Sequence, residues 1–449
     1  MRNFKSIIKC VVFLLLCAAM FVVCDFLFMP SGYIRVILHT LNHSEENFDT
    51  VVLGASHGRS AIDPAKIDEQ FGSNAINISI PNEKVKDSYY LLKESCRNND
   101  VKTVIMDLDY QYWFKLGDND FADTFIYSYM EPSSVKLEYF RDNLINKDFR
   151  LSFVEWARYS AQYSRIKKNV ATKQTDEYQD YDISAAEVGD ANGPYVDKGF
   201  FYRKDGGHEG RGKITRVQWN DSCADPKVLG YFDQIVNYCK ENNIRLICVT
   251  SPITPATALA GASEQSGAFF TRLAQQYGIE YYDFNLLKYD VLPRVNTDFG
   301  DWEGHMCGKL AEPYSTILGQ VITEAQNGTL DADSYFYKDY DELKKDTNSV
   351  LYLETDVNQT KNEDGTYTIS FEMNDTICGS EVSPQYRVSI KEMVSDNSDD
   401  EVNVVSTEYD GKTKYTFTIP AGNYRLRVYA KDINATDDQE YCEKILKLQ

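Results

Sequence analysis

The chain has 449 residues, with 47 basic and 68 acidic side chains and a formal net charge of −21. An acidic surface repels phosphate backbones, so we do not expect nucleic-acid binding. The length suggests two or three domains, and a hydrophobic share of 43% is enough for a sizeable core. The mean hydropathy of −0.44 excludes a multi-pass membrane protein but is compatible with one anchor.

The first thirty residues are far more apolar than the rest. Three basic residues precede or begin the segment from Ile7 to Met29, which is long enough to cross a bilayer of about 30 Å. Basic residues before the span and the acidic Asp25 near its end predict a cytoplasmic N-terminus. The alternative is a cleaved signal peptide, but bulky residues occupy the expected cleavage region. We therefore predict an uncleaved membrane anchor at 1–30 and extracellular C-terminal domains, at the cell membrane.

Short apolar strands then alternate with amphipathic helices. The first part contains strands over 48–54, 75–80 and 101–108, a helix that Asp63 caps and Pro64 opens, and a helix over 87–97. The rhythm resumes with helix 228–242, strand 245–250, helix 264–277, strand 279–283 and helix 311–325. This alternation is typical of a parallel sheet, so we predict an α/β domain over 48–330.

Residues 116–225 interrupt this rhythm and are interpreted as a helical and loop insertion. One helix is expected near 151–168, followed by a polar loop over 172–193. The aromatic residues at its start are candidates for stacking on sugar rings or for ordinary core packing: Tyr110, Tyr112, Trp113, Phe114, Tyr127 and Tyr129.

The C-terminal region, 334–449, has a different pattern. Apolar and polar residues alternate, and Asp364-Gly365 and Asp410-Gly411 form hairpin-type turns, which predicts a small antiparallel β-sandwich. Residues 331–449 carry 25 acidic and 13 basic side chains, so more than half of the excess negative charge lies here. That charge favours solubility and repels anionic polymers.

The chain has few histidines, and this limits the residues that could act as a histidine base. They are His39, His43, His57, His208 and His305. Ser56 follows the first strand directly, and open α/β sheets bind ligands beyond the carboxyl ends of their strands. His57 adjoins Ser56, but neighbouring side chains there point apart, so His57 is not expected to be the base. His305 precedes the last helix, beside Asp301 and Glu303.

A serine, a histidine and a carboxylate are the parts of acyl-transfer chemistry, because serine needs a base and the base needs an acid to hold its tautomer. The alternative is that Ser56 only caps a turn and that His305 is a surface loop residue. Taken together, at opposite ends of one α/β domain, the two residues favour the functional interpretation. Asp301 is the preferred acid and Glu303 its rival.

Two motifs resemble the SGNH (GDSL-type) hydrolases. Gly54-Ala55-Ser56-His57 resembles their first block, with the serine directly after the first strand. Asp301 to His305 resembles the last block, and the continuation to Ser315 resembles the start of the final helix. The resemblance covers about 48–115 and 226–325, and it implies a flavodoxin-like three-layer α/β/α fold. The anchor and the insertion resemble the membrane-bound branch, which includes the teichoic acid D-alanine-transfer protein and exopolysaccharide O-acetyltransferases.

The chain departs from this family at three places. The family's acid lies three residues before the histidine, where this chain has Trp302. The family's oxyanion glycine corresponds to Asn82, and its oxyanion asparagine corresponds to Gln111. Asparagine tolerates positive φ, so its backbone N–H can still serve, and the Gln111 amide can donate.

The resemblance implies a cell-surface serine esterase or acyltransferase that acts on O-acyl groups of envelope glycans or related polymers through an acyl-enzyme. Its catalytic residues would be Ser56, His305 and Asp301, its oxyanion donors Asn82 and Gln111, and it would need no metal or cofactor. The implied partners are an envelope polysaccharide or acylated wall polymer, the membrane, and a membrane-bound acyl-transfer protein. The alternative is a non-catalytic surface protein that kept the fold and binds glycan or a membrane partner. A Ser56–His305 separation within hydrogen-bond reach favours the enzyme, and more than about 6 Å favours the binder.

Overall fold

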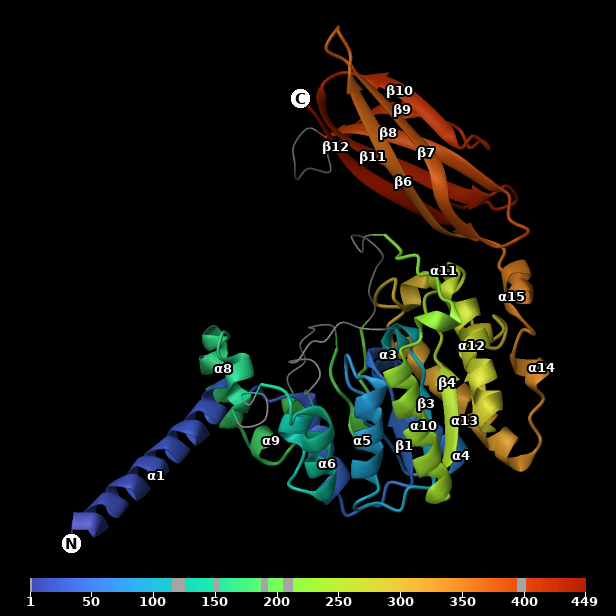
Figure 1. Cartoon of the computed structure of the whole chain (residues 1–449). Helices are drawn as coiled ribbons and strands as arrows, with labels where there is room; N and C mark the ends of the chain where they lie inside the picture. Colours follow the sequence, from blue (N-terminus) through green and yellow to red (C-terminus); the bar gives the residue numbers. More distant parts are fainter. Residues whose placement is uncertain are drawn as a thin grey trace.

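The computed structural model describes residues 2–114, 126–148, 150, 154–186, 193–204, 213–393 and 401–449. A long N-terminal helix, an α/β region and two antiparallel sheets follow one another along the chain (Figure 1). Helix α1 (Arg2–Phe28) contains a 24-residue stretch, Lys5–Phe28, that is long and apolar enough to cross a membrane. Helix α2 (Tyr33–His43) follows and is largely buried.

The α/β region is built on five parallel strands. These are β1 (Thr50–Leu53), β2 (Ala75–Asn77), β3 (Thr103–Asp107), β4 (Arg245–Thr250) and β5 (Glu280–Asp283). Their order is β2-β1-β3-β4-β5, which is the flavodoxin-like order and places the topological switch point between β1 and β3. Every residue of β1 and β3 is buried, as expected for strands covered on both faces.

Helices cover both faces of this sheet (Figure 1). They are α3 (Ser56–Ala61), α4 (Pro64–Phe71), α5 (Val85–Ser95), α10 (Pro226–Glu241), α11 (Pro255–Ala258), α12 (Ala262–Tyr277) and α13 (Gly308–Asn327). Val51 packs in one core cluster with residues of α5 and α10, whereas Val52 packs in another with residues of α4 and α13. Helix α4 begins as expected, with Asp63 accepting from the Ala65 N–H. The predicted three-layer α/β class is confirmed.

The segment between β3 and β4 contains short helical pieces rather than the predicted single helix over 151–168. They are η1 (Tyr110–Trp113), η3 (Tyr127–Tyr129), α6 (Ser134–Asn143), η4 (Glu155–Tyr159), η5 (Tyr163–Arg165), α8 (Ile166–Lys173), α9 (Asp176–Gln179), η6 (Ile183–Ala185), η7 (Asp197–Gly199) and η8 (Asp221–Cys223). That prediction is wrong because contacts with α1, and not local periodicity, organise 154–173: Trp156 packs on Phe28, and Lys173 donates to carbonyls of α1. Residues 151–153 lie outside the described part.

Of the aromatic residues that open the insertion, Trp113 belongs to the core. It is 1% exposed, and its ring lies 5.2 Å from the Phe232 ring and 5.0 Å from the Phe270 ring, measured between centroids. Tyr127 is also buried and stacks on Tyr139. For these two residues, core packing accounts for the aromatic character without a sugar.

The C-terminal region confirms the predicted β-sandwich. After α14 (Ala332–Tyr335) and α15 (Tyr340–Asp346) come β6 (Val350–Lys361), β7 (Tyr367–Cys378), β8 (Pro384–Met393), β9 (Glu401–Ser406), β10 (Lys414–Ile419), β11 (Gly422–Asp432) and β12 (Glu440–Leu448). They form two antiparallel sheets, β10-β7-β6 and β12-β11-β8-β9, which share one hydrophobic core. Alternating burial along β11 shows one face turned inward.

Candidate active site

Ser56 begins helix α3 at the carboxyl end of β1. The preceding residue, Ala55, is extended, and the chain turns sharply into the helix there. Asn77, at the end of β2, is fully buried, and its side-chain amide donates to the carbonyls of Gly58 and Ile62. This buried amide fixes α3 against the sheet and therefore fixes the position of Ser56.

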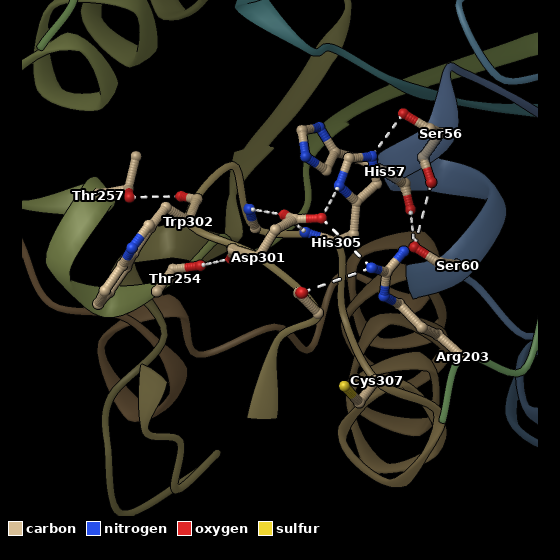
Figure 2. A network of polar contacts seen from close by, with 12 residues as sticks. Ser56, His57, Ser60, Arg203, Thr254, Thr257, Asp301, Trp302, His305 and Cys307 are labelled. Carbon is tan, nitrogen blue, oxygen red and sulfur yellow. Dashed lines mark hydrogen bonds and ion pairs between the residues drawn. The ribbon is translucent and has the colours of Figure 1, made fainter. Parts of the chain in front are cut away.

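His305 lies 249 residues after Ser56 in the sequence, in the loop before α13, and its side chain contacts Ser56. Its Nε2 lies 2.7 Å from the Ser56 Oγ, and its Nδ1 lies 2.8 Å from the Asp301 Oδ2 (Figure 2). One imidazole thus connects a hydroxyl to a carboxylate through two hydrogen bonds. The sequence prediction brought together these three residues, and the structure places them in contact in that order.

Asp301 is the acid that faces His305, whereas the rival Glu303 has no bond to that ring among the contacts of the described residues. The second oxygen of Asp301, Oδ1, accepts from the backbone N–H groups of Gly304 and His305 at 3.0 and 3.2 Å. The carboxylate therefore organises the turn that carries its own partner. Asp301 therefore lies four residues before His305, one residue further away than the resemblance in sequence implied.

The turn between Asp301 and His305 depends on a glycine. Gly304 has φ +104°, and a Cβ there would lie 2.4 Å from the Cβ of Ile253. The loop is tied to the segment after β4, because the Thr254 and Thr257 hydroxyls donate to the carbonyls of Asp301 and Trp302 (Figure 2). The acid and the base are thus held by backbone contacts, as a preorganised site requires.

The insertion contributes an arginine to this site. The Arg203 guanidinium is buried, and its Nη2 lies 3.4 Å from both the Asp301 Oδ2 and the Gly300 carbonyl oxygen (Figure 2). A Cβ on Gly300 would lie 1.7 Å from the Arg203 Nε, so only glycine leaves room for the guanidinium. Sequence reasoning missed Arg203, since no local motif connects residue 203 to residue 301.

The charges around the triad hold the imidazole neutral and the acid ionised. Burial lowers the pKa of His305, the His57 charge lowers it further, and the hydrogen bond with Asp301 only partly offsets this. Burial opposes ionisation of Asp301, but the bonds with His305 and the charge of Arg203 hold the pKa of this carboxyl well below its usual range. A neutral imidazole beside an ionised carboxylate is the state in which histidine acts as a base.

A second histidine–carboxylate pair lies directly beside the first and was not predicted. The Nδ1 of His57 lies 2.7 Å from the Asp109 Oδ2, and both side chains are buried. The His57 ring packs against the His305 ring with centroids 4.5 Å apart and planes inclined by 35°. The expectation that His57 is not the base for Ser56 agrees with this orientation toward Asp109. A signal was available, because Asp107 ends β3 and Asp109 follows it, and β3 is the strand next to β1.

The predicted oxyanion donors are positioned less closely than the triad. Asn82 has φ +62° and is exposed in the turn after β2, and Gln111 is partly buried in η1, where its backbone N–H donates to Asp109. Burial and the Asp109 charge raise the pKa of the neighbouring Tyr112 to about 12, and an interaction with Ser56 partly offsets them. The phenol is therefore neutral at physiological pH.

No family model matches the sequence, and no curated protein matches it. The fold is similar to a putative acylhydrolase from Bacteroides fragilis, with 10% identity, a TM-score of 0.28, and 66% of this chain and 95% of that chain covered. It is also similar to a GDSL-like lipase from Bacteroides thetaiotaomicron, with 12% identity, a TM-score of 0.29, and 67% and 99% covered. The fold assignment rests on the strand order and the site on its own contacts, since likenesses at this level add no argument.

Proposed function

We propose that this protein is a serine esterase or acyltransferase that works through an acyl-enzyme. The observation that supports it is the continuous hydrogen-bonded chain from Ser56 through His305 to Asp301, at 2.7 and 2.8 Å. A separation within hydrogen-bond reach favours an enzyme over a non-catalytic binder.

The reaction begins when the Ser56 Oγ attacks the carbonyl carbon of an acyl ester. His305 Nε2 takes the serine proton, and Asp301 holds the Nδ1–H tautomer and stabilises the imidazolium that forms. His305 then protonates the leaving alcohol, and the acyl group stays on Ser56. Water completes a hydrolysis, and a sugar hydroxyl completes a transfer, each giving up its proton to His305.

The tetrahedral intermediate needs donors for its oxyanion. Asn82 and Gln111 remain the candidates from sequence, and we add Tyr112 because its neutral hydroxyl lies close enough to Ser56 for Ser56 to affect its pKa. Each such donor is typically worth about 3 kcal/mol in the transition state.

We further propose that the chain is a single-pass protein at the cell membrane, with its N-terminus in the cytoplasm, and that its substrates are O-acyl groups of envelope glycans or related polymers. Helix α1 supports the span, because Lys5–Phe28 is long and apolar enough to cross a membrane. Its last carbonyls accept hydrogen bonds from the insertion: Asn169 donates to Leu27 and Phe28, and Lys173 donates to Asp25 and Phe26. The acidic sandwich favours a neutral or cationic glycan over a polyanion.

The test is labelling of the full chain, in detergent or membranes, by a fluorescent fluorophosphonate. We expect rapid labelling of the wild type and none of Ser56→Ala, because only an activated serine reacts. Ser334→Ala, at an exposed serine of α14, is the matched control and should label normally. Equal labelling of Ser56→Ala and the wild type would contradict the proposed nucleophile.

Substrate and orientation need separate measurements. Incubation with O-acetylated wall glycans should release acetate or move it to an added acceptor, and Ser56→Ala should do neither. In intact cells, external protease should remove a C-terminal tag while an N-terminal tag stays protected. Protection of the C-terminal tag would contradict the proposed orientation.

A further inference from the structure

His57 and His305 form a pair of imidazoles in contact and tilted relative to each other, each with its own aspartate. The His57 ring is 4.5 Å from the His305 ring between centroids, and its Nδ1 is bound to Asp109 at 2.7 Å. His57 belongs to α3 and directly follows the nucleophile, whereas His305 comes from the loop before α13. The contact therefore joins the two halves of the site.

The surroundings of His57 are negatively charged and buried. Asp109 and Asp107 face it from the end of β3, and Asp301 and His305 face it from the loop before α13. Asp109 and Asp107 are 9% and 5% exposed, and His57 is 6% exposed. Buried carboxylates need a compensating charge, and His57 is the basic group that touches Asp109.

A small cavity lies beside this cluster. It measures about 20 Å³, and its lining includes His57, Asp107, Asp109, Thr250 and Ser251 together with apolar side chains such as Leu108 and Ile253. This volume is large enough for one water molecule. The Nε2 of His57 is buried and has no hydrogen-bond partner among the described residues.

We propose that His57, held by Asp109, is a positioning residue for His305: its buried positive ring fixes the plane of the second imidazole and keeps that imidazole in the neutral form that accepts a proton. This inference rests on the proposed function. The neighbouring charge favours loss of a proton from His305, so the base works at a lower pH than an isolated histidine would. Burial lowers the pKa of His57. The negative charges of Asp109, Asp107 and Asp301 raise it by more, so that the pKa of His57 is about 9.

The experiment follows the pH dependence of fluorophosphonate labelling in the full chain. In the wild type, the rate should fall only at acid pH, when His305 gains a proton. In His57→Gln the pKa of His305 should rise, so the fall in labelling rate at acid pH begins at a higher pH. The rate should therefore drop about threefold or more near pH 6 and change little near pH 8.5. His43→Gln, at an exposed histidine of α2, is the matched control and should follow the wild type.

A double variant separates charge from structure. His57→Gln leaves Asp109 uncompensated beside His305, whereas His57→Gln with Asp109→Asn removes both charges, so its acid limb should move back toward the wild type. An equal loss at every pH in His57→Gln, or a double variant as shifted as the single one, would overturn the proposal. Absence of labelling in the wild type would instead contradict the proposed function.

If His57→Gln does not fold, NMR of the wild-type chain tests the proposal instead. In ¹⁵N-histidine-labelled protein at pH 7, His57 should show both ring nitrogens protonated and His305 only one, with signals assigned from single variants of the other histidines. A neutral His57 at pH 7 would overturn the proposal.

Discussion

The Nη2 of Arg203 lies 3.4 Å from the Oδ2 of Asp301, the same carboxylate oxygen that accepts from His305. Arg203 belongs to the segment that interrupts the α/β rhythm, between β3 and β4. The insertion therefore completes the environment of the proposed acid as well as covering the sheet. The backbone carbonyl of Arg203 also accepts a hydrogen bond from the Gly308 N–H at the start of α13.

The first prediction concerns this arginine. Arg203→Ala should lower the fluorophosphonate labelling rate about tenfold, because a bond between charged groups is worth about 1.5–3 kcal/mol and this one is long. Arg216→Ala is the matched control, since Arg216 lies in the same insertion and pairs with Asp375 at the surface. Equal rates for the two variants would show that Arg203 has no part in holding Asp301.

The second prediction distinguishes the two candidate acids. Asp301→Asn should lower the labelling rate by about 10²–10⁴-fold, because the amide favours the wrong tautomer of His305. Glu303→Gln should stay within about twofold of the wild type, since the His305 Nδ1 faces Asp301. The opposite ranking would move the role of the acid to Glu303.

The fold was predictable because its signals are local. Hydrophobic strands bounded by helix caps, such as Asp63-Pro64, specify a parallel sheet, and alternation along β11 specifies a sandwich. The triad was predictable because Ser56 follows a strand and His305 precedes a helix. Arg203 was not, because its contact with Asp301 joins segments 98 residues apart without a local motif. The His57–Asp109 pair was missed although both residues lie just after the ends of neighbouring strands. The helices of 154–173 were misjudged for the same reason as Arg203, since α1 supplies their partners.

The third prediction concerns the oxyanion donor. Tyr112→Phe should lower the labelling rate about a hundredfold if Tyr112 donates to the oxyanion, because it removes the neutral hydroxyl near Ser56 while keeping the ring. Gln111→Ala changes the neighbouring residue and should have a smaller effect. A larger loss in Gln111→Ala would return the role to the glutamine that the sequence suggested.

The fourth prediction links His57 to stability. Its pKa is raised in the folded state to about 9 from an ordinary value of 6.5, so its contribution is fully present below pH 6.5 and is lost as pH rises through 9. The difference in free energy of unfolding between the wild type and His57→Gln should therefore shrink by about 2–3 kcal/mol between pH 6.5 and pH 9.5. Urea unfolding of the full chain in detergent measures it. A difference that does not change with pH would show that His57 is neutral in the folded protein.

The last prediction concerns Gly304, whose positive φ lets the chain turn between the acid and the base. Gly304→Ala should destabilise the protein by about 2 kcal/mol or more, since an alanine there is both strained and in collision with Ile253. The collision also displaces His305, so labelling should fall about tenfold or more in the fraction that folds. Gly328→Ala is the matched control, because Gly328 has φ +67° but open space around its Cβ position. It should lose about 1 kcal/mol of stability and label normally. If both variants label alike, the turn does not hold His305 in place, and the hydrogen bonds of Asp301 to the backbone must do so alone.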